Sequence, residues 1–251
     1  MIKKILLVLL IAMLPIKLNA VSVKAEDLHI EVNEETYYVF TRDNIKDNEE
    51  LKALGIPYGY MKNMLTSNNC YMDAIKRNTE KLTDALEILL VISDAQDTSN
   101  LHIYSDDEVQ RLSDYMKERY EAETEDPSLQ IHIEKSELLA INGYRYLYYS
   151  YYDPGYEKYL EDYHTIINGK IYTIKFQNSK EYNEEELKEI NEIIKSITFD
   201  IDEKYEKIKE PSFFTKYQYL ITALITVAIL TPIRIKMKNK KKEEDEKKDN
   251  E

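Results

Sequence analysis

The sequence predicts an α+β domain, an antiparallel β-sheet packed by helices, followed by one C-terminal transmembrane helix. Asn142-Gly143 and Asn168-Gly169 each separate two runs rich in β-branched and aromatic residues. Asn-Gly favours the type I′ turn of a β-hairpin, which needs positive φ at both positions. The segments Ser105–Glu108 and Asn183–Glu186 have the spacing of a capping box, in which a helix begins. Two predicted hairpins and two predicted capped helices therefore indicate the α+β class.

The first half of the domain is expected to alternate between short strands and short helices. Strands are predicted at Leu28–Val32 and Tyr37–Thr41, joined by polar residues 33–35, and helical turns at Glu49–Leu54 and Tyr60–Leu65. Two further strands are expected at Cys70–Arg77, which could also be helical, and at Leu86–Ser93. The last is nearly continuously apolar, which is typical of a central strand.

The second half carries the stronger signals. Apolar residues recur at helical spacing after Ser105, so one amphipathic helix is expected from Asp106 to about Glu123. The other expected elements are, in order, the hairpin of Ile131–Ile141 and Tyr144–Tyr152, the hairpin of Tyr159–Ile167 and Lys170–Gln177, a helix over Glu184–Lys195, and a short strand over Ile197–Phe199.

The N-terminus has the pattern of a secretory signal peptide. Lys3 and Lys4 precede the apolar run Ile5–Leu14, and small-residue cleavage sites follow at Ala20 and Ala25. Residues 1–25 are therefore predicted to be removed, after either Ala20 or Ala25. The alternative is an uncleaved first helix, which would leave the following domain on the same side of the membrane.

A second apolar stretch near the C-terminus predicts a membrane anchor. Tyr217–Ile233 contains no charged residue, and residues 213–235 are long enough to cross a bilayer core of about 30 Å. Lysines follow it, so the positive-inside rule places residues 236–251 in the cytoplasm. The predicted topology is a single-pass protein of the cell membrane, with domain 26–199 outside and residues 200–212 as a charged stalk. The alternative is a buried core helix of a soluble protein.

The predicted exported part is strongly acidic. Residues 26–210 contain 21 Lys and Arg against 41 Asp and Glu. Nucleic-acid binding depends on neutralising phosphates with basic residues, so we expect no nucleic-acid partner. Cys70 is the only cysteine, which excludes an internal disulfide and predicts a small buried hydrophobe at that position.

Motifs that would indicate catalysis or a cofactor are lacking in the sequence. It has no G-x-S-x-G, no phosphate-binding glycine loop and no H-E-x-x-H, so we expect neither an enzyme nor a cofactor, and assign no catalytic or metal residue. His132 and His164 lie in predicted strands, and a contact between them across the sheet would form part of a metal site. Asp94, Asp97 and Asn100 offer oxygens for a hard cation without calcium-loop spacing.

Tyrosines concentrate in residues 144–163. On strand 144–152 they divide between two faces: Tyr144, Tyr146, Tyr148 and Tyr152 on one, Tyr149 and Tyr151 on the other. One face should pack under a helix. If the other is uncovered, it is a candidate protein- or glycan-binding surface. The predicted interaction surface is Tyr149, Tyr151, Tyr156 and Tyr159, and the alternative is structural packing.

The chain resembles the PsbP-like fold in the segment Leu138–Phe199. The residues that carry the resemblance are Ile141–Tyr144, Ile166–Ile174 and Leu187–Phe199, while the rest matches only in element order. The resemblance implies an antiparallel sheet between helices, an α/β/α sandwich. It also implies a non-catalytic role, because members of this fold include extrinsic subunits of membrane complexes and other binding proteins.

These observations lead to two hypotheses of function. In the first, the exported domain binds another envelope protein or is an accessory subunit of a membrane complex. In the second, it is a small-ligand or metal-binding receptor with an acidic pocket near Asp94–Asp107.

Overall fold

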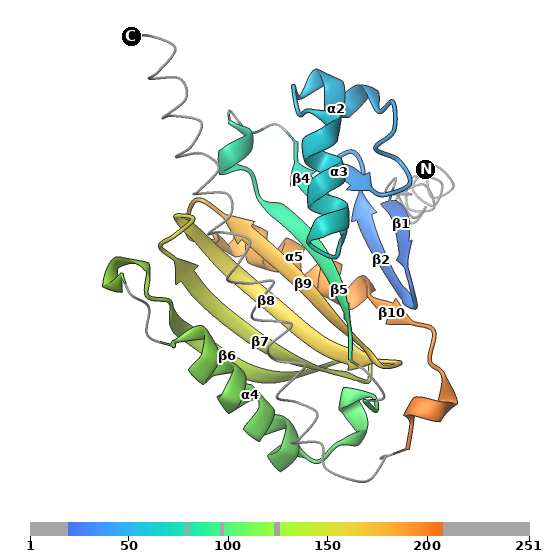
Figure 1. Ribbon diagram of the computed structural model, residues 1–251, viewed down its shortest axis with the longest axis vertical. Helices are drawn as coiled ribbons and strands as arrows, with labels where there is room; N and C mark the ends of the chain where they lie inside the picture. Colours follow the sequence, from blue (N-terminus) through green and yellow to red (C-terminus); the bar gives the residue numbers. More distant parts are fainter. Residues whose placement is uncertain (1–19, 78, 80, 96–97, 123–125, 208–251) are drawn as a thin grey trace, which may run out of the picture.

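The computed structural model describes residues 20–77, 79, 81–95, 98–122 and 126–207. They form the predicted α+β domain, whose strands make two antiparallel sheets (Figure 1). The larger sheet has seven strands in the order β3-β4-β5-β9-β8-β7-β6, and the smaller has three in the order β1-β2-β10. The larger sheet carries the site described below.

The strands of the larger sheet lie close to the predicted positions. They are β3 (Tyr37–Thr41), β4 (Cys70–Lys76), β5 (Glu87–Asp94), β6 (His132–Ile141), β7 (Tyr144–Asp153), β8 (Lys158–Ile167) and β9 (Lys170–Asn178). Both Asn-Gly pairs turn hairpins with positive φ at both residues, 53° and 83° at Asn142-Gly143 and 51° and 73° at Asn168-Gly169. The predicted hairpin chemistry is confirmed.

The helices also follow their sequence signals. They are α2 (Glu49–Ala53), α3 (Tyr58–Ser67), α4 (Asp106–Tyr120) and α5 (Glu184–Ser196), with short 3₁₀ turns at η1 (Leu82–Asp84), η2 (Leu101–Ile103), η3 (Pro127–Leu129) and η4 (Glu203–Tyr205). Both predicted capping boxes are present, at the starts of α4 and α5.

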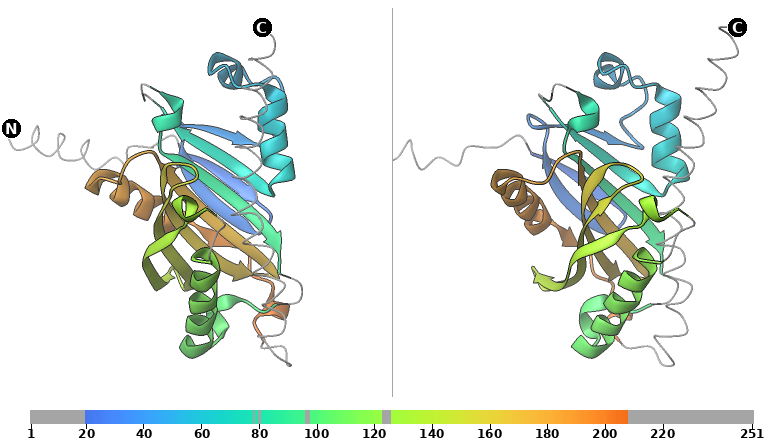
Figure 2. Two further views of the ribbon diagram at one scale, coloured as in Figure 1. Left: turned by 60° about the vertical axis from the view of Figure 1, so that its left-hand side comes forward. Right: turned by 90° about the vertical axis from the view of Figure 1, so that its left-hand side faces the viewer.

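Helices lie on both faces of the larger sheet. One face is closed by α5 together with the small sheet of β1 (Ala20–Ala25), β2 (Leu28–Asn33) and β10 (Thr198–Phe199). On the opposite face α3 packs on β4 and α4 packs on β6 and β7, at the two sides of the sheet (Figures 1 and 2). We call these the closed face and the split face.

The described fold extends past the predicted domain bounds, residues 26–199, at both ends, while cleavage after Ala20 or Ala25 stays a prediction. Residues 20–25, assigned to the signal peptide, form β1, and every one of them pairs with β2. The first residues of the predicted stalk are also docked on the domain: the Asp200 amide donates to Asp27 O at 2.8 Å, and the Ser99 hydroxyl donates to Lys207 O at 2.7 Å. The domain therefore reaches from residue 20 to at least residue 207.

The predicted segments 28–32 and 37–41 are strands joined by a turn at residues 34–36, as expected, and β2 belongs to the small sheet while β3 belongs to the large one. The predicted signal-peptide core and the predicted anchor, residues 213–235, lie outside the described residues. Among the residues described, no helix is long and apolar enough to cross a membrane.

Candidate functional site

The candidate site lies at the centre of the split face, between α3 and α4. Antiparallel register aligns side chains of β5, β9 and β8 there in three rows. The rows read, across the three strands, Glu87, Gln177 and Leu160; Leu89, Lys175 and Asp162; and Val91, Thr173 and His164. Because alternate residues of a strand share a face, six polar side chains of three interior strands lie together on this face: Glu87, Gln177, Lys175, Asp162, Thr173 and His164. We call these nine residues the floor.

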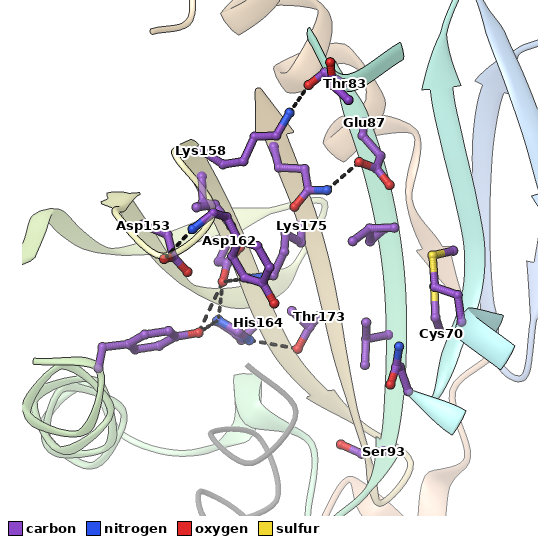
Figure 3. Close-up of a pocket in the computed structure, with 18 of the residues that line it drawn as sticks. Cys70, Thr83, Glu87, Ser93, Asp153, Lys158, Asp162, His164, Thr173 and Lys175 are labelled. Carbon is purple, nitrogen blue, oxygen red and sulfur yellow. Dashed lines mark hydrogen bonds and ion pairs between the residues drawn. The ribbon is translucent and has the colours of Figure 1, made fainter. Parts of the chain in front are cut away.

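Asp162 is the centre of a buried polar cluster on this floor (Figure 3). Its Oδ2 accepts hydrogen bonds from Tyr151 Oη at 2.9 Å, Lys175 Nζ at 2.9 Å and Tyr120 Oη at 3.2 Å. Lys175 also forms the ion pair with this carboxylate. An ion pair in a low-dielectric site is tolerated only when further hydrogen bonds support it, and the two tyrosines supply such bonds at Oδ2.

The other carboxylate oxygen of Asp162, Oδ1, takes part in none of these hydrogen bonds. Oδ1 is buried and has no hydrogen-bond partner among the described residues. Such an orphan acceptor costs about 1–3 kcal/mol, so it needs an explanation in function or bound solvent.

His164 extends the cluster as a neutral imidazole. Its Nδ1 lies 2.9 Å from Thr173 Oγ1, and its Nε2 lies 3.3 Å from Tyr120 Oη. Burial lowers the pKa of His164 to about 4, against the raising effect of Asp162. One tautomer satisfies both contacts: Nδ1 accepts from the Thr173 hydroxyl, and Nε2–H donates to Tyr120.

At the other side of the floor, two carboxyl groups meet, and no ion pair within the described part of the chain includes either of them. Asp73 on β4 is buried and hydrogen-bonded to Glu87, and its Oδ1 is unpartnered among the described residues. Burial, and then the neighbouring Glu87, raise the pKa of Asp73 well above its usual value. Two such groups in contact share a proton more readily than they ionise together.

A pocket of about 420 Å³ stands over the floor. Its walls include Tyr60 and Met64 of α3, Tyr120 of α4 and Tyr156 of the β7–β8 connection. The volume lies in the range of small-molecule sites, which are mostly apolar with a few placed polar groups. Cys70 also lines it, but it is buried, as predicted, and burial raises the pKa of its thiol.

The predicted tyrosine surface is wrong at two of its four positions. Tyr149 and Tyr151 are buried, 0% and 2% exposed, because α4 covers their face of β7. Tyr149 Oη contacts Ser113 Oγ of α4 at 3.0 Å. Tyr156 and Tyr159 are partly exposed, and Tyr156 lies in the pocket wall. The other tyrosine face of β7 packs in the closed core, so both faces are covered.

The metal hypotheses gain no support from the geometry. His132 and His164 do not meet, because β7 separates their strands. Within the described part of the chain, no three His, Cys, Asp or Glu side chains are grouped as a metal site. Asp97 lies outside the described residues, and Asn100 is committed to the fold, accepting from the Asn168 amide at 2.7 Å and donating to Glu206.

Sequence reasoning missed the floor. A signal was present: β8 and β9 place Asp162, His164, Thr173 and Lys175 in the interior strands of a large sheet, where apolar residues are expected. What the sequence did not supply was the order of the strands, since β5 and β9 are 75 or more residues apart but adjacent in the sheet.

Comparison with known proteins finds similarity to solved structures. No protein-family model matches the chain, and no curated protein matches it. The solution structure of cyanobacterial PsbP (CyanoP) from Synechocystis sp. PCC 6803 is similar, with a TM-score of 0.44, 11% identity, and coverage of 72% of this chain and 91% of that one. This similarity carries no argument about the fold family or the function of the chain.

Proposed function

We propose that this chain is a non-catalytic ligand-binding protein, whose exported PsbP-like domain holds a small, largely apolar molecule in the pocket of the split face. The observation that carries the proposal is the floor: charged and polar side chains on interior strands, beneath a pocket of about 420 Å³. Buried polar groups are costly to a fold, so their grouping in one pocket favours a site over a packing role.

The proposal places the domain outside the cell membrane, held by the predicted anchor at residues 213–235. The support is the sequence: an apolar stretch followed by lysines, and a signal-peptide pattern at the other end. The docked residues 200–207 leave only residues 208–212 of the predicted stalk between domain and anchor, so the domain would stand close to the bilayer.

The test is native mass spectrometry of the full chain, extracted from its own membrane in mild detergent. We expect a bound small molecule on the wild-type chain. Val91→Phe, which places a larger side chain on the floor, should abolish it. Leu187→Phe on the exposed side of α5 is the matched control and should retain it. Equal retention by Val91→Phe, or no bound molecule together with no thermal stabilisation by any compound of a metabolite library, would overturn the proposal.

A second candidate function is an accessory subunit of a membrane complex. Tyr58 and Tyr60 favour it, since both are large side chains 46% and 54% exposed on α3, and tyrosine is enriched at protein interfaces. The same mass measurement distinguishes the two functions. A second protein in fixed ratio, lost in the double variant Tyr58→Ala/Tyr60→Ala, supports the subunit role, and a bare monomer with a small ligand excludes it.

A further inference from the structure

The pocket has chemically different ends. At one end Asp162 already has a cation, because Lys175 Nζ lies 2.9 Å from it. At the other end Glu87 accepts a hydrogen bond from Gln177, a neutral amide, and shares a second one with Asp73. That second end contains two carboxyl groups and, within the described residues, no Lys or Arg paired with either.

The second lysine of the pocket, Lys158, donates to the carbonyl of Thr83 in η1, and no ion pair among the described residues joins it to Glu87. Beside Glu87, Asp73 is only 2% exposed, and its Oδ1 has no partner among the described residues. A buried carboxyl group so placed is unfavourable unless a cation or a proton compensates it.

Aromatic side chains stand beside the same end. Tyr60 of α3 and Tyr156 of the β7–β8 connection line the same pocket as Glu87. Tyrosine rings attract cations through their faces, and aromatic walls with an acidic group are the usual surroundings of an organic ammonium ion.

We propose that the ligand of this pocket is an organic amine, with its ammonium group at Glu87 between Tyr60 and Tyr156 and its apolar body over Leu89 and Val91. The inference rests on the proposed ligand-binding function. A bare metal ion fits this end less well, because only two carboxyl groups meet there and a metal needs more ligands. An anionic ligand would face Glu87 directly, which like-charge repulsion disfavours.

The test compares three probes that share a phenyl group and differ in charge: 2-phenylethylamine, 2-phenylethanol and 3-phenylpropionate. Each is titrated calorimetrically into the full chain in mild detergent, with empty micelles as the blank. We expect the amine to bind at least about tenfold more tightly than the alcohol, and the carboxylate to bind most weakly.

Glu87→Gln isolates the charge, because the amide has the same shape as the carboxylate. This variant should lose the preference for amine over alcohol and keep the affinity for the alcohol, which also shows that the pocket is intact. Glu192→Gln, on the exposed surface of α5, removes the same charge elsewhere and should change neither affinity.

The outcomes separate this inference from the proposed function. Binding of all three probes with similar affinity, or an amine preference that survives Glu87→Gln, overturns the amine assignment while a ligand pocket remains. Binding by none of them, with no molecule retained in the mass measurement, overturns both.

Discussion

The two faces of the seven-stranded sheet are formed by the same strands but carry different side chains. On the closed face, β5, β8 and β9 present apolar side chains such as Ile88, Phe176 and Tyr163 to α5 and the small sheet. On the split face the same strands present Glu87, Lys175 and other polar residues between two separated helices. The closed face therefore buries the larger apolar core and should contribute most of the free energy of unfolding. Polar residues accumulate on the split face, in the part that no described helix covers.

The largest expected difference between the faces is the cost of truncation. Phe176→Ala, on the closed face, removes a fully buried ring and should cost about 3–5 kcal/mol of unfolding free energy. Leu89→Ala, on the neighbouring strand of the same sheet but on the split face and only partly buried, should cost about 1 kcal/mol. Urea unfolding of both variants measures the difference, and equal losses would show that the split face is as closely packed as the closed one.

The buried ion pair gives the next prediction. Lys175→Ala leaves the carboxylate of Asp162 buried without its cation, which should cost about 3 kcal/mol. Adding Asp162→Asn removes the charge that was left, so the double variant should recover most of that loss. A double-mutant cycle by urea unfolding reports the coupling, and simple additivity of the two changes would contradict the cluster described above.

His164 should make the free energy of unfolding depend on pH, by an amount similar to or smaller than the loss expected for Lys175→Ala. Its pKa falls from an ordinary 6.5 to about 4 on folding. A base with a depressed folded pKa contributes stability that is present above the unfolded pKa and is lost as the pH falls. The wild-type chain should therefore lose on the order of 3 kcal/mol between pH 6.5 and pH 4 through this group. His164→Asn should flatten that acid limb in thermal unfolding followed by circular dichroism, and an unchanged limb would show that the imidazole is not buried.

Asp73 gives the smallest effect, with the opposite sign. Its pKa is raised, so the stability it contributes is present at low pH and is lost as the pH rises through the folded pKa. Asp73→Asn keeps a neutral group beside Glu87 at all pH values, and should raise stability at pH 8 by about 1 kcal/mol with little change at pH 4. The matched control is Asp84→Asn on the exposed η1 turn, which should change neither value.

Local signals in the sequence predicted most of the fold. The φ values at Asn142-Gly143 and the capping box at Ser105 depend only on neighbouring residues, and both were predictable. Strand β1 was not predicted. Its small residues at Ala20 and Ala25 resemble a signal-peptide cleavage site, and its strand conformation depends on pairing with β2.

The site depends on pairing between strands far apart in the chain, and for that reason it was not predicted from the sequence. Alternation correctly placed Tyr149 and Tyr151 on one face of β7, but which helix covers that face is a property of the packed structure. Likewise, Glu87 and Lys175 come to line one site only because β5 lies beside β9. Polar residues in interior strands were the available clue, and they marked the floor more directly than the tyrosines did.

The most direct test of the central claim is whether the floor is open to small molecules in the folded chain. Leu89→Cys places a thiol on the floor, and Leu90→Cys places one on the closed face, where the side chain is fully buried; both are made in a Cys70→Ser background in the full chain. Maleimide should label Leu89→Cys under native conditions and Leu90→Cys only after unfolding. Native protection of both thiols would mean that the split face is covered like the closed one, and would contradict a ligand site there.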